Sequence, residues 1–183
     1  MSMFERTELL LGAEGIEKLQ KAHVLVFGVG GVGSYTVEAL ARAGVGALTL
    51  VDDDTVSESN LNRQLVALRS TQNQPKVQVA ARRIADINPD CRVTPVQMFY
   101  TPETAPALPF EGFDYVVDAV DTVSAKIEII RRAREAGVPV VSCSISGCSL
   151  LPVPMQLITG TPASRARRMI SILAETVSTA STT

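Results

Sequence analysis

The feature that most constrains the fold is a glycine-rich turn, GVGGVG at residues 28–33, which lies between an apolar run and a helical pattern. The apolar run, HVLVF at residues 23–27, is continuous, as is typical of a strand that is buried on both faces of a sheet. After the turn, Val37, Leu40 and Ala41 fall on one face of a predicted helix. The order strand, glycine turn, helix predicts the first unit of an α/β fold with a parallel sheet.

Strand and helix patterns continue to alternate over most of the chain. Further strands are predicted at residues 47–52, 92–96, 115–120 and 138–143, and further helices at residues 8–22, 77–88 and 123–136. The first of these helices is expected to break near Gly12 and Gly15, and the last is expected to place Ile127 and Ile130 inward. The alternation predicts an α/β fold with a doubly wound, mainly parallel sheet and a Rossmann-like nucleotide-binding turn.

The composition excludes several classes of protein. A chain of 183 residues with 46% hydrophobic and 20% charged residues fits one globular domain and rules out wholesale disorder. A formal net charge of -2 provides no general basic surface for a nucleic-acid backbone. The first residues lack the basic region and long apolar stretch of a signal peptide, and no apolar run is long enough to cross a membrane.

Cysteine usage favours a reducing compartment, so a cytoplasmic location is expected. Cys91, Cys143 and Cys148 are odd in number and include no CxxC pair, which argues against a disulfide framework and against a four-cysteine zinc site. Cys143 and Cys148 are candidates for a nucleophile, but a cysteine at the end of a buried strand is more often simply packed. Neither is assigned a catalytic role.

The composition divides the chain into an organised domain, residues 1–143, and an atypical tail, residues 144–183. The tail is rich in serine and threonine and contains no aromatic residue. Its charged residues are Arg165, Arg167, Arg168 and Glu175. Two interpretations stay open: a short variant with its own disordered tail, or a sequence that is shifted out of frame or truncated near residue 144.

Polar residues gather just after the predicted strands, where parallel sheets bind their ligands. The GVGGVG turn satisfies GxGxxG, a pattern that lets the backbone approach a phosphate, although the same glycines also serve as a purely structural turn. Asp52 follows the second strand, where an acid commonly holds a ribose hydroxyl, and a solvated acidic turn with Asp53 and Asp54 is the alternative. These features alone also suit an NAD-dependent oxidoreductase.

The loop that follows favours a nucleoside triphosphate over a hydride carrier. Asn60, Asn62, Arg63 and Gln64 concentrate amide and guanidinium donors. Lys76 begins the next helix, where the helix dipole disfavours a cation by ~0.3 to 1 kcal/mol, so an anionic partner is expected; an ordinary surface lysine is the alternative. Fixed positive charge is what the cleavage of a triphosphate requires.

Two carboxylates, Asp118 and Asp121, follow the fourth strand. One carboxylate at a strand end facing phosphates is typical of a Mg²⁺ site, because this ion usually takes one or two carboxylates and completes its shell with water and phosphate oxygens. Asp121 is the predicted metal ligand. The alternative is that Asp121 caps the helix that follows it.

The motifs together resemble the ThiF-type adenylating family, which includes ubiquitin-activating enzymes and activators of sulfur-carrier proteins. The resemblance covers residues 6–143 and rests on GVGGVGS, VDDD, NLNRQ, QPKV, INPDC and DAVDT, in that order. The segments RTELLLGAEGIEKL, VGSYTVEALARAGVG and NRQLVALRST look most similar to the tRNA threonylcarbamoyladenosine dehydratase branch. After Cys143 the chain departs from the family pattern, because no aspartate-proline step follows.

The resemblance implies a role for each matching residue. Gly28, Gly30, Gly31 and Gly33 are expected around the phosphates of ATP, Asp52 on the ribose, Asn60, Arg63 and Lys76 on the phosphates, and Asp121 on Mg²⁺. Arg63, Lys76 and Arg6 are the expected catalytic residues. Arg6 matches an arginine that reaches into the ATP site of a partner subunit, so the resemblance also implies a homodimer.

The implied reaction is ATP-dependent activation of a carboxylate by adenylation. In the dehydratase branch the carboxylate belongs to threonylcarbamoyladenosine in tRNA, and its activation leads to ring closure with net loss of water. One alternative is an adenylyltransferase for a ubiquitin-like sulfur-carrier protein, with a sulfur-carrier or cysteine desulfurase system as partner. Another alternative is an inactive nucleotide-binding remnant.

Overall fold

A six-stranded sheet forms the centre of the computed structural model, which describes residues 2–144 and 147–151. The strands lie in the order β3-β2-β1-β4-β5-β6, and all neighbouring pairs are parallel except β5 and β6. Their bounds are β1 His23–Phe27, β2 Ala47–Val51, β3 Arg92–Val96, β4 Tyr115–Asp118, β5 Val140–Ser144 and β6 Gly147–Leu151. The prediction of a mainly parallel α/β sheet is confirmed.

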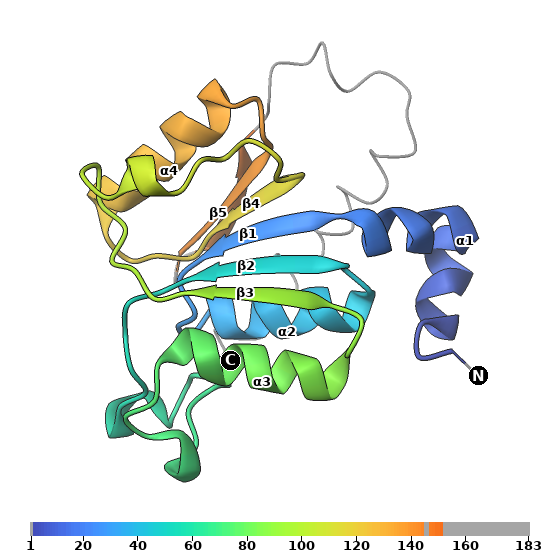
Figure 1. Ribbon diagram of the computed structural model, residues 1–183, viewed down its shortest axis with the longest axis horizontal. Helices are drawn as coiled ribbons and strands as arrows, with labels where there is room; N and C mark the ends of the chain where they lie inside the picture. Colours follow the sequence, from blue (N-terminus) through green and yellow to red (C-terminus); the bar gives the residue numbers. More distant parts are fainter. Residues whose placement is uncertain (1, 145–146, 152–183) are drawn as a thin grey trace.

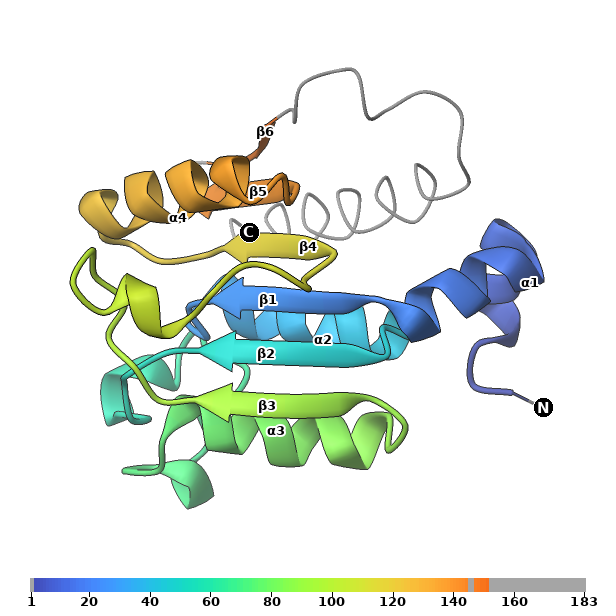
Figure 2. The ribbon, with the colours of Figure 1, turned by 45° about the horizontal axis from the view of Figure 1, so that its top comes forward.

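Helices cover both faces of the sheet, as Figures 1 and 2 show. Their bounds are α1 Glu5–Lys21, α2 Gly33–Ala43, α3 Lys76–Ile87 and α4 Val123–Glu135. On one face α2 and α3 pack in a core that includes Leu40 and Ile84. On the other face α4 packs in a second core, which includes Phe27 and Ile129. The described part of the chain is therefore doubly wound.

The register of the strands brings the polar segments of the sequence together. Phe27, the last residue of β1, lies opposite Val51 at the end of β2 and opposite Asp118 at the end of β4. The chain runs from β1 to β2 on one side and later returns to place β4 on the other side of β1. Such a switch point opens a crevice beyond the carboxyl ends of the strands, and the glycine turn lies there.

The predicted buried face of α2 is confirmed, because Val37, Leu40 and Ala41 are buried, whereas that of α4 is partly wrong. In α4 the buried residues are Ala125, Ile129 and Ala133, and Ile127 is 62% exposed. Residues two apart on a helix point to different sides, so the spacing of Ala125 and Ile129 turns Ile127 away from the sheet. Ile127 was therefore wrongly placed and Ile130 is partly buried, because the prediction overlooked the small residues Ala125 and Ala133 that share the buried face with Ile129.

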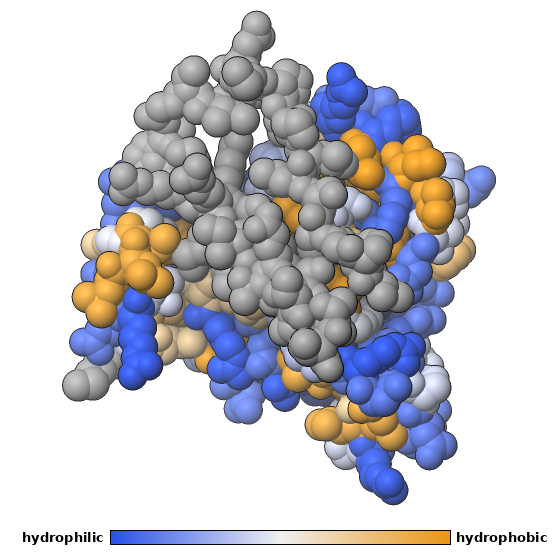
Figure 3. Space-filling model, turned by 180° about the vertical axis from the view of Figure 1, so that it is seen from behind, coloured by the Kyte–Doolittle hydropathy of each residue, from blue (hydrophilic) through white to orange (hydrophobic). Residues whose placement is uncertain are grey.

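Helix α1 breaks at Gly12, as predicted, but continues through Gly15. Gly12 has a φ of 71° and a non-helical backbone inside α1. Leu9 and Leu10 are 84% and 85% exposed, so these two side chains do not pack on the described residues of this chain, whereas Leu11 packs against the first core. Apolar side chains of this helix gather at the left of the molecule in Figure 3.

Strand β6 was not predicted from the sequence. It pairs antiparallel with β5 and extends the sheet beyond residue 143. The rest of the atypical tail, from residue 152 on, lies outside the described residues. Within the described part of the chain, no helix combines the length and apolar character that crossing a membrane demands.

The cysteines differ from the prediction at one position. Cys91 is free and buried, and burial raises its pKa to about 11. Cys143 is packed in the first core, as predicted, but it is disulfide-bonded, which differs from the expectation of reduced cysteines. In the register of β5 and β6, the residue opposite Cys143 is Cys148.

Candidate functional site

A pocket of about 640 Å³ opens at the carboxyl ends of the parallel strands. Its walls come from the segments that follow β1, β2, β3 and β4. The volume is within the ~300 to 1,000 Å³ range of small-molecule sites. Of the residues predicted from the sequence, the pocket is lined by Gly28, Gly30, Gly31, Asp52, Asn60, Arg63, Lys76 and Asp121.

The four glycines of the turn serve two different purposes. Gly28 has a φ of +84°, and a Cβ there would lie 2.6 Å from the backbone oxygen of Ala119; a Cβ on Gly33 would lie 1.9 Å from the backbone oxygen of Gly28. Internal packing therefore requires both glycines. A Cβ on Gly30 or Gly31 would have no atom nearer than 3.7 Å or 3.8 Å. Packing does not require glycine at these two positions, and both leave their backbone open to a ligand.

The N-terminus of α2 opens toward the same part of the pocket. The helix begins at Gly33, and Gly31 and Val32 just before it line the pocket. Its first turn has no acidic residue and no side-chain cap. The partial positive charge of a helix N-terminus favours a bound anion at this place.

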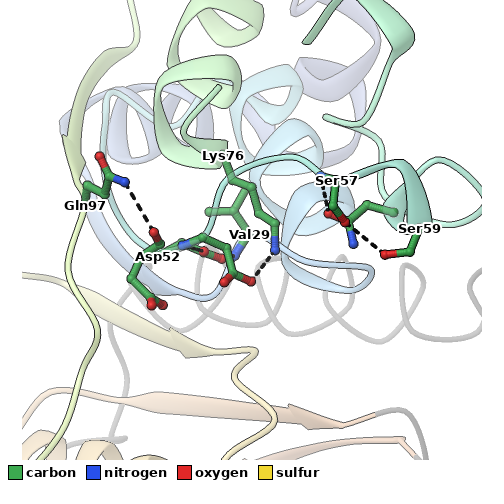
Figure 4. A network of polar contacts seen from close by, with 9 residues as sticks. Val29, Asp52, Ser57, Ser59, Lys76 and Gln97 are labelled. Carbon is green, nitrogen blue, oxygen red and sulfur yellow. Dashed lines mark hydrogen bonds and ion pairs between the residues drawn. The ribbon is translucent and has the colours of Figure 1, made fainter. Parts of the chain in front are cut away.

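Asp52 follows β2 and holds the glycine turn from the side. Its Oδ2 accepts a hydrogen bond from the backbone N–H of Val29 at 2.6 Å, and its Oδ1 accepts one from the backbone N–H of Asp54 at 2.9 Å (Figure 4). Burial raises the pKa of Asp52, while the Val29 hydrogen bond and the charge of Lys76 oppose the rise. Each carboxylate oxygen has a second acceptor position, so Asp52 can also accept a hydrogen bond from a ligand hydroxyl.

Lys76 is buried, which excludes the alternative of an ordinary surface lysine. Its side chain is 5% exposed, and its Nζ lies 2.6 Å from Oδ2 of Asp54 (Figure 4). The backbone N–H of Lys76 also donates to the carbonyl oxygen of Asp54 at 3.0 Å. The Asp54 side chain is 64% exposed, so an anion in the pocket can compete with it for the lysine.

The loop between β2 and α3 places Asn60 and Arg63 on the pocket wall. Asn60 is buried, and its Oδ1 accepts a backbone N–H of the loop at 3.0 Å. Arg63 is exposed, and its Nη1 donates to the carbonyl oxygen of Ser59 at 2.8 Å and to Oδ1 of Asn62 at 3.0 Å. These contacts hold a guanidinium group beside the glycine turn.

The two carboxylates after β4 have different surroundings. Asp118 is fully buried, and its Oδ2 lies 3.0 Å from Nζ of Lys126 and accepts a hydrogen bond from Oγ of Ser142 at 2.6 Å. Asp118 is thus committed to an internal ion pair. Asp121 is exposed and lines the pocket. Helix α4, which begins at Val123, has no side-chain cap, so the capping alternative for Asp121 finds no support.

Arg6 does not line the pocket of its own chain. It is an exposed residue of α1. This helix lies beyond the amino ends of the strands, whereas the glycine turn lies at their carboxyl ends (Figure 1). The structure therefore separates Arg6 from the other predicted site residues.

Apolar residues form a wall of the pocket that the sequence did not predict. Met98, Phe99 and Tyr100 follow β3 and line the pocket. The ring of Tyr100 packs on the ring of Phe27 with 4.5 Å between centroids. These residues follow the end of a strand, as Asp52 does, so their position could have identified them. They were missed because the sequence analysis considered only polar residues after the strands.

The pocket thus combines a polar floor with an apolar wall. The glycine turn, the helix N-terminus, Arg63 and Lys76 are groups that bind phosphates. Phe99 and Tyr100 provide apolar surface of the kind on which a flat ring packs. The arrangement fits a nucleotide whose phosphates rest on the turn and whose base lies against the wall.

Known proteins resemble this chain in sequence and in structure. The tRNA threonylcarbamoyladenosine dehydratase of Bacillus subtilis is 50% identical over 142 residues, which is 78% of this chain and 56% of that protein. The molybdopterin-synthase adenylyltransferase of Salmonella typhimurium is 41% identical over 144 residues, which is 78% of this chain and 57% of that protein. The crystal structure of the E. coli tRNA N6-threonylcarbamoyladenosine dehydratase in complex with ATP is similar with a TM-score of 0.76 and 38% identity, and the match covers 92% of this chain and 72% of that one.

The chain spans little more than half the length of the two curated relatives. A model of one protein family, described as the ThiF family, matches residues 4–165. This match includes the glycine turn, the pocket and every described strand. The chain belongs to the ThiF family.

Proposed function

We propose that this chain activates a carboxylate by transferring AMP to it from ATP, and that the carboxylate belongs to threonylcarbamoyladenosine in tRNA. The observation that carries the proposal is the meeting, in one pocket, of an unobstructed glycine turn, a helix N-terminus and the buried Lys76. The similarity to a tRNA threonylcarbamoyladenosine dehydratase crystallised with ATP supports both the nucleotide and the substrate. We also propose that the protein acts in the cytoplasm, because its proposed substrate is tRNA.

Each pocket residue has a proposed role in binding ATP. The open backbone at Gly30 and Gly31 supports placing the phosphates on the turn that Gly28 and Gly33 shape. The remaining acceptor positions of Asp52 support a contact with the ribose. Asn60, Arg63 and Lys76 would contact the phosphates.

The proposed reaction follows from the charges in the pocket. A carboxylate oxygen of the substrate attacks the α-phosphorus, the bond to the β-phosphate breaks, and pyrophosphate leaves with the electron pair. Lys76 and Arg63 stabilise the negative charge that develops on the phosphates without forming a bond themselves. The carbamoyl group then closes on the activated carbonyl, and AMP leaves with the former carboxylate oxygen, which amounts to the loss of water.

A divalent cation fits the oxygen-rich side of the pocket. Asp121 is the proposed ligand of Mg²⁺, and the same pocket is lined by Asp52, Asp53 and Asp54, of which one carboxylate oxygen each lies within 4.8 Å of the others. When bound, Mg²⁺ would neutralise charge on the phosphates. Asp118 does not fit this role, because Lys126 and Ser142 occupy its carboxylate.

A homodimer is part of the proposal. Arg6 lies away from its own pocket, so it acts in catalysis only if it enters the pocket of a partner subunit. Leu9 and Leu10 on the same helix are almost fully exposed, which supports a partner that covers α1.

A second candidate function is the adenylation of a sulfur-carrier protein. The similarity to a molybdopterin-synthase adenylyltransferase favours this candidate, since the same pocket would activate a carboxylate of a protein instead of RNA. A third candidate, an inactive nucleotide-binding remnant, predicts ATP binding without turnover.

The release of AMP from ATP distinguishes these candidates. The purified chain would be given Mg²⁺, ATP and either tRNA that carries threonylcarbamoyladenosine or the same tRNA without the modification. We expect AMP only with the modified tRNA. AMP formation with a sulfur-carrier protein and not with tRNA would replace the proposal by the second candidate, and ATP binding with no AMP from any substrate would replace it by the third.

A further inference from the structure

We propose that Tyr35 is a specificity-determining residue of the pocket, whose ring stacks on the modified adenine of the RNA substrate while the carboxylate of that nucleoside lies at the phosphates of ATP. This inference rests on the proposed function, because it takes threonylcarbamoyladenosine in tRNA as the substrate. Tyr35 has no proposed role in binding ATP, and it takes no part in the breaking or forming of bonds.

Exposed aromatic side chains are rare in this protein, and they gather in the pocket. The chain contains three tyrosines, five phenylalanines and no tryptophan. Among the described residues, the exposed members of this set are Tyr35, at 38%, and Phe99, at 56%, and both line the pocket. A single exposed apolar residue needs no explanation. Two exposed rings in one pocket indicate that flat ligand groups pack there.

Tyr35 is held on a rigid element and is not used for packing between rings. The ring–ring contacts among the described residues do not include it. Its neighbours Ser34 and Thr36 are buried, and Oγ of Ser34 accepts the backbone N–H of Leu65 at 3.1 Å. The backbone that carries Tyr35 is therefore fixed before a ligand arrives, so a ligand gains a contact surface at a small cost in conformational entropy.

Tyr35 lies at the phosphate end of the pocket and not at the wall proposed for the base of ATP. It belongs to the first turn of α2, which begins at Gly33 in the glycine turn. Phe99 follows β3, and β2 separates β3 from β1 in the sheet. A base that packs on Phe99, with its phosphates at Gly30 and Gly31, leaves the ring of Tyr35 available for a second flat group.

The chemistry of the proposed substrate places a base beside the phosphates. In threonylcarbamoyladenosine, the threonine and the carbamoyl group form a short link between the carboxylate and the adenine. The adenine therefore lies close to the glycine turn when the carboxylate attacks the α-phosphorus. Proteins recognise unstacked RNA bases by stacking them on aromatic side chains. A chain with a formal net charge of -2 has no general basic surface for RNA, so such stacking carries more of the recognition.

The substitution Tyr35→Ala tests the inference. The KM for modified tRNA in the release of AMP should rise about 5-fold to 100-fold, the loss of one stacked base. The dissociation constant for ATP, measured by calorimetry, should stay unchanged. Alanine favours a helix and Tyr35 is exposed, so the melting temperature should not fall. Tyr35→Phe keeps the ring and should restore the KM of the unaltered chain.

Two control variants separate stacking from other effects. Leu68→Ala removes a side chain that is 51% exposed and does not line the pocket, so it should change neither the KM for tRNA nor the affinity for ATP. Phe99→Ala removes the other exposed ring of the pocket and should weaken the binding of ATP, in contrast to Tyr35→Ala.

A binding measurement keeps this inference apart from the proposed function. The full chain, loaded with a non-hydrolysable ATP analogue, would be titrated into a fluorescent RNA hairpin that carries threonylcarbamoyladenosine in its loop, and anisotropy would report binding without turnover. Binding that weakens in Tyr35→Ala and not in Tyr35→Phe supports the role of Tyr35. If the same chain released no AMP with modified tRNA, the proposed function alone would be overturned.

The opposite results would overturn the role of Tyr35. An unchanged KM for tRNA together with unchanged affinity for the hairpin in Tyr35→Ala would show that the ring does not contact the RNA. A loss of ATP affinity in Tyr35→Ala with an unchanged affinity for the hairpin would assign the ring to ATP instead. In both cases, AMP release that depends on modified tRNA would leave the proposed function supported.

Discussion

Glycines occur at both ends of the parallel sheet, but they leave space for a ligand at the carboxyl end and allow close packing of the backbone at the amino end. At the carboxyl end, Gly30 and Gly31 have space around them, and Lys76 has an exposed carboxylate as its partner. At the amino end, a Cβ on Gly46 would lie 1.7 Å from the backbone oxygen of Gln20, so the chain closes tightly on itself. A glycine or a buried charge is therefore evidence for a binding site only where internal packing does not explain it. Packing explains Gly46 but does not explain Gly30 or Gly31.

The amino end also satisfies its polar side chains internally. The imidazole of His23 lies 2.9 Å from Oγ1 of Thr49, and its ring packs on Phe113 with 4.5 Å between centroids. At the carboxyl end, Oε1 of Gln64 is buried and has no hydrogen-bond partner among the residues that the structure describes. Polar groups that can still form hydrogen bonds with a ligand are therefore found at the carboxyl end.

The largest effect on activity is expected from Lys76→Ala. Removing a fixed charge at the phosphates should lower AMP formation by about 100-fold to 1,000-fold. The fold should persist, because the partner Asp54 is exposed and can be solvated. Lys21→Ala, an exposed lysine of α1 at the amino end, is the control and should retain full turnover. Equal turnover of both variants would show that Lys76 has no role in the reaction.

Two alanine substitutions compare the glycines of the two ends. Gly46→Ala should lower the free energy of unfolding by about 3 kcal/mol, because the new Cβ meets backbone that cannot move aside. Gly30→Ala should change it by less than about 1 kcal/mol while weakening ATP binding. Chemical denaturation and calorimetry measure the two quantities. A large loss of stability in Gly30→Ala would contradict the distinction between the ends.

A smaller effect is expected from Asp54→Asn. This change removes the carboxylate that competes with a ligand for Lys76, so the affinity for ATP should increase about twofold to fivefold. Asp53→Asn removes the same charge from the same pocket without touching Lys76 and is the matched control. An equal gain in both variants would assign the effect to net charge instead of the ion pair.

The smallest expected effect is the contribution of His23, at the amino end of β1, to the pH dependence of the free energy of unfolding. Burial lowers the pKa of His23 below its ordinary value of 6.5, with a further contribution from the charge of Arg92. The unfolded chain then binds more protons than the folded chain below pH 6.5, so the free energy of unfolding decreases as the pH falls through this range. His23→Gln should reduce that decrease, and denaturation curves between pH 7 and pH 5, a range around the ordinary His pKa, would measure it. An unchanged pH dependence would contradict the account of His23.

Local patterns predicted the sheet and the turn well, because strand and helix periods are properties of neighbouring residues. The strands at residues 23–27 and 92–96 have the predicted bounds. The pairing of side chains that are far apart in the sequence could not be predicted from such patterns. Nothing in the sequence showed that Asp54 would meet Lys76, or that Ser142 and Lys126 would occupy Asp118. The orientation of Ile127 was wrong because small residues set the buried face of α4.

The placement of a nucleotide is the central claim, and a crystal structure of the full chain with a non-hydrolysable ATP analogue and Mg²⁺ tests it most directly. We predict phosphates on the backbone of Gly30 and Gly31, with Lys76 in hydrogen-bond contact with a phosphate oxygen. An analogue bound elsewhere, for example in the hollow that Ile127 and Arg131 line on the outer side of α4, would contradict the claim.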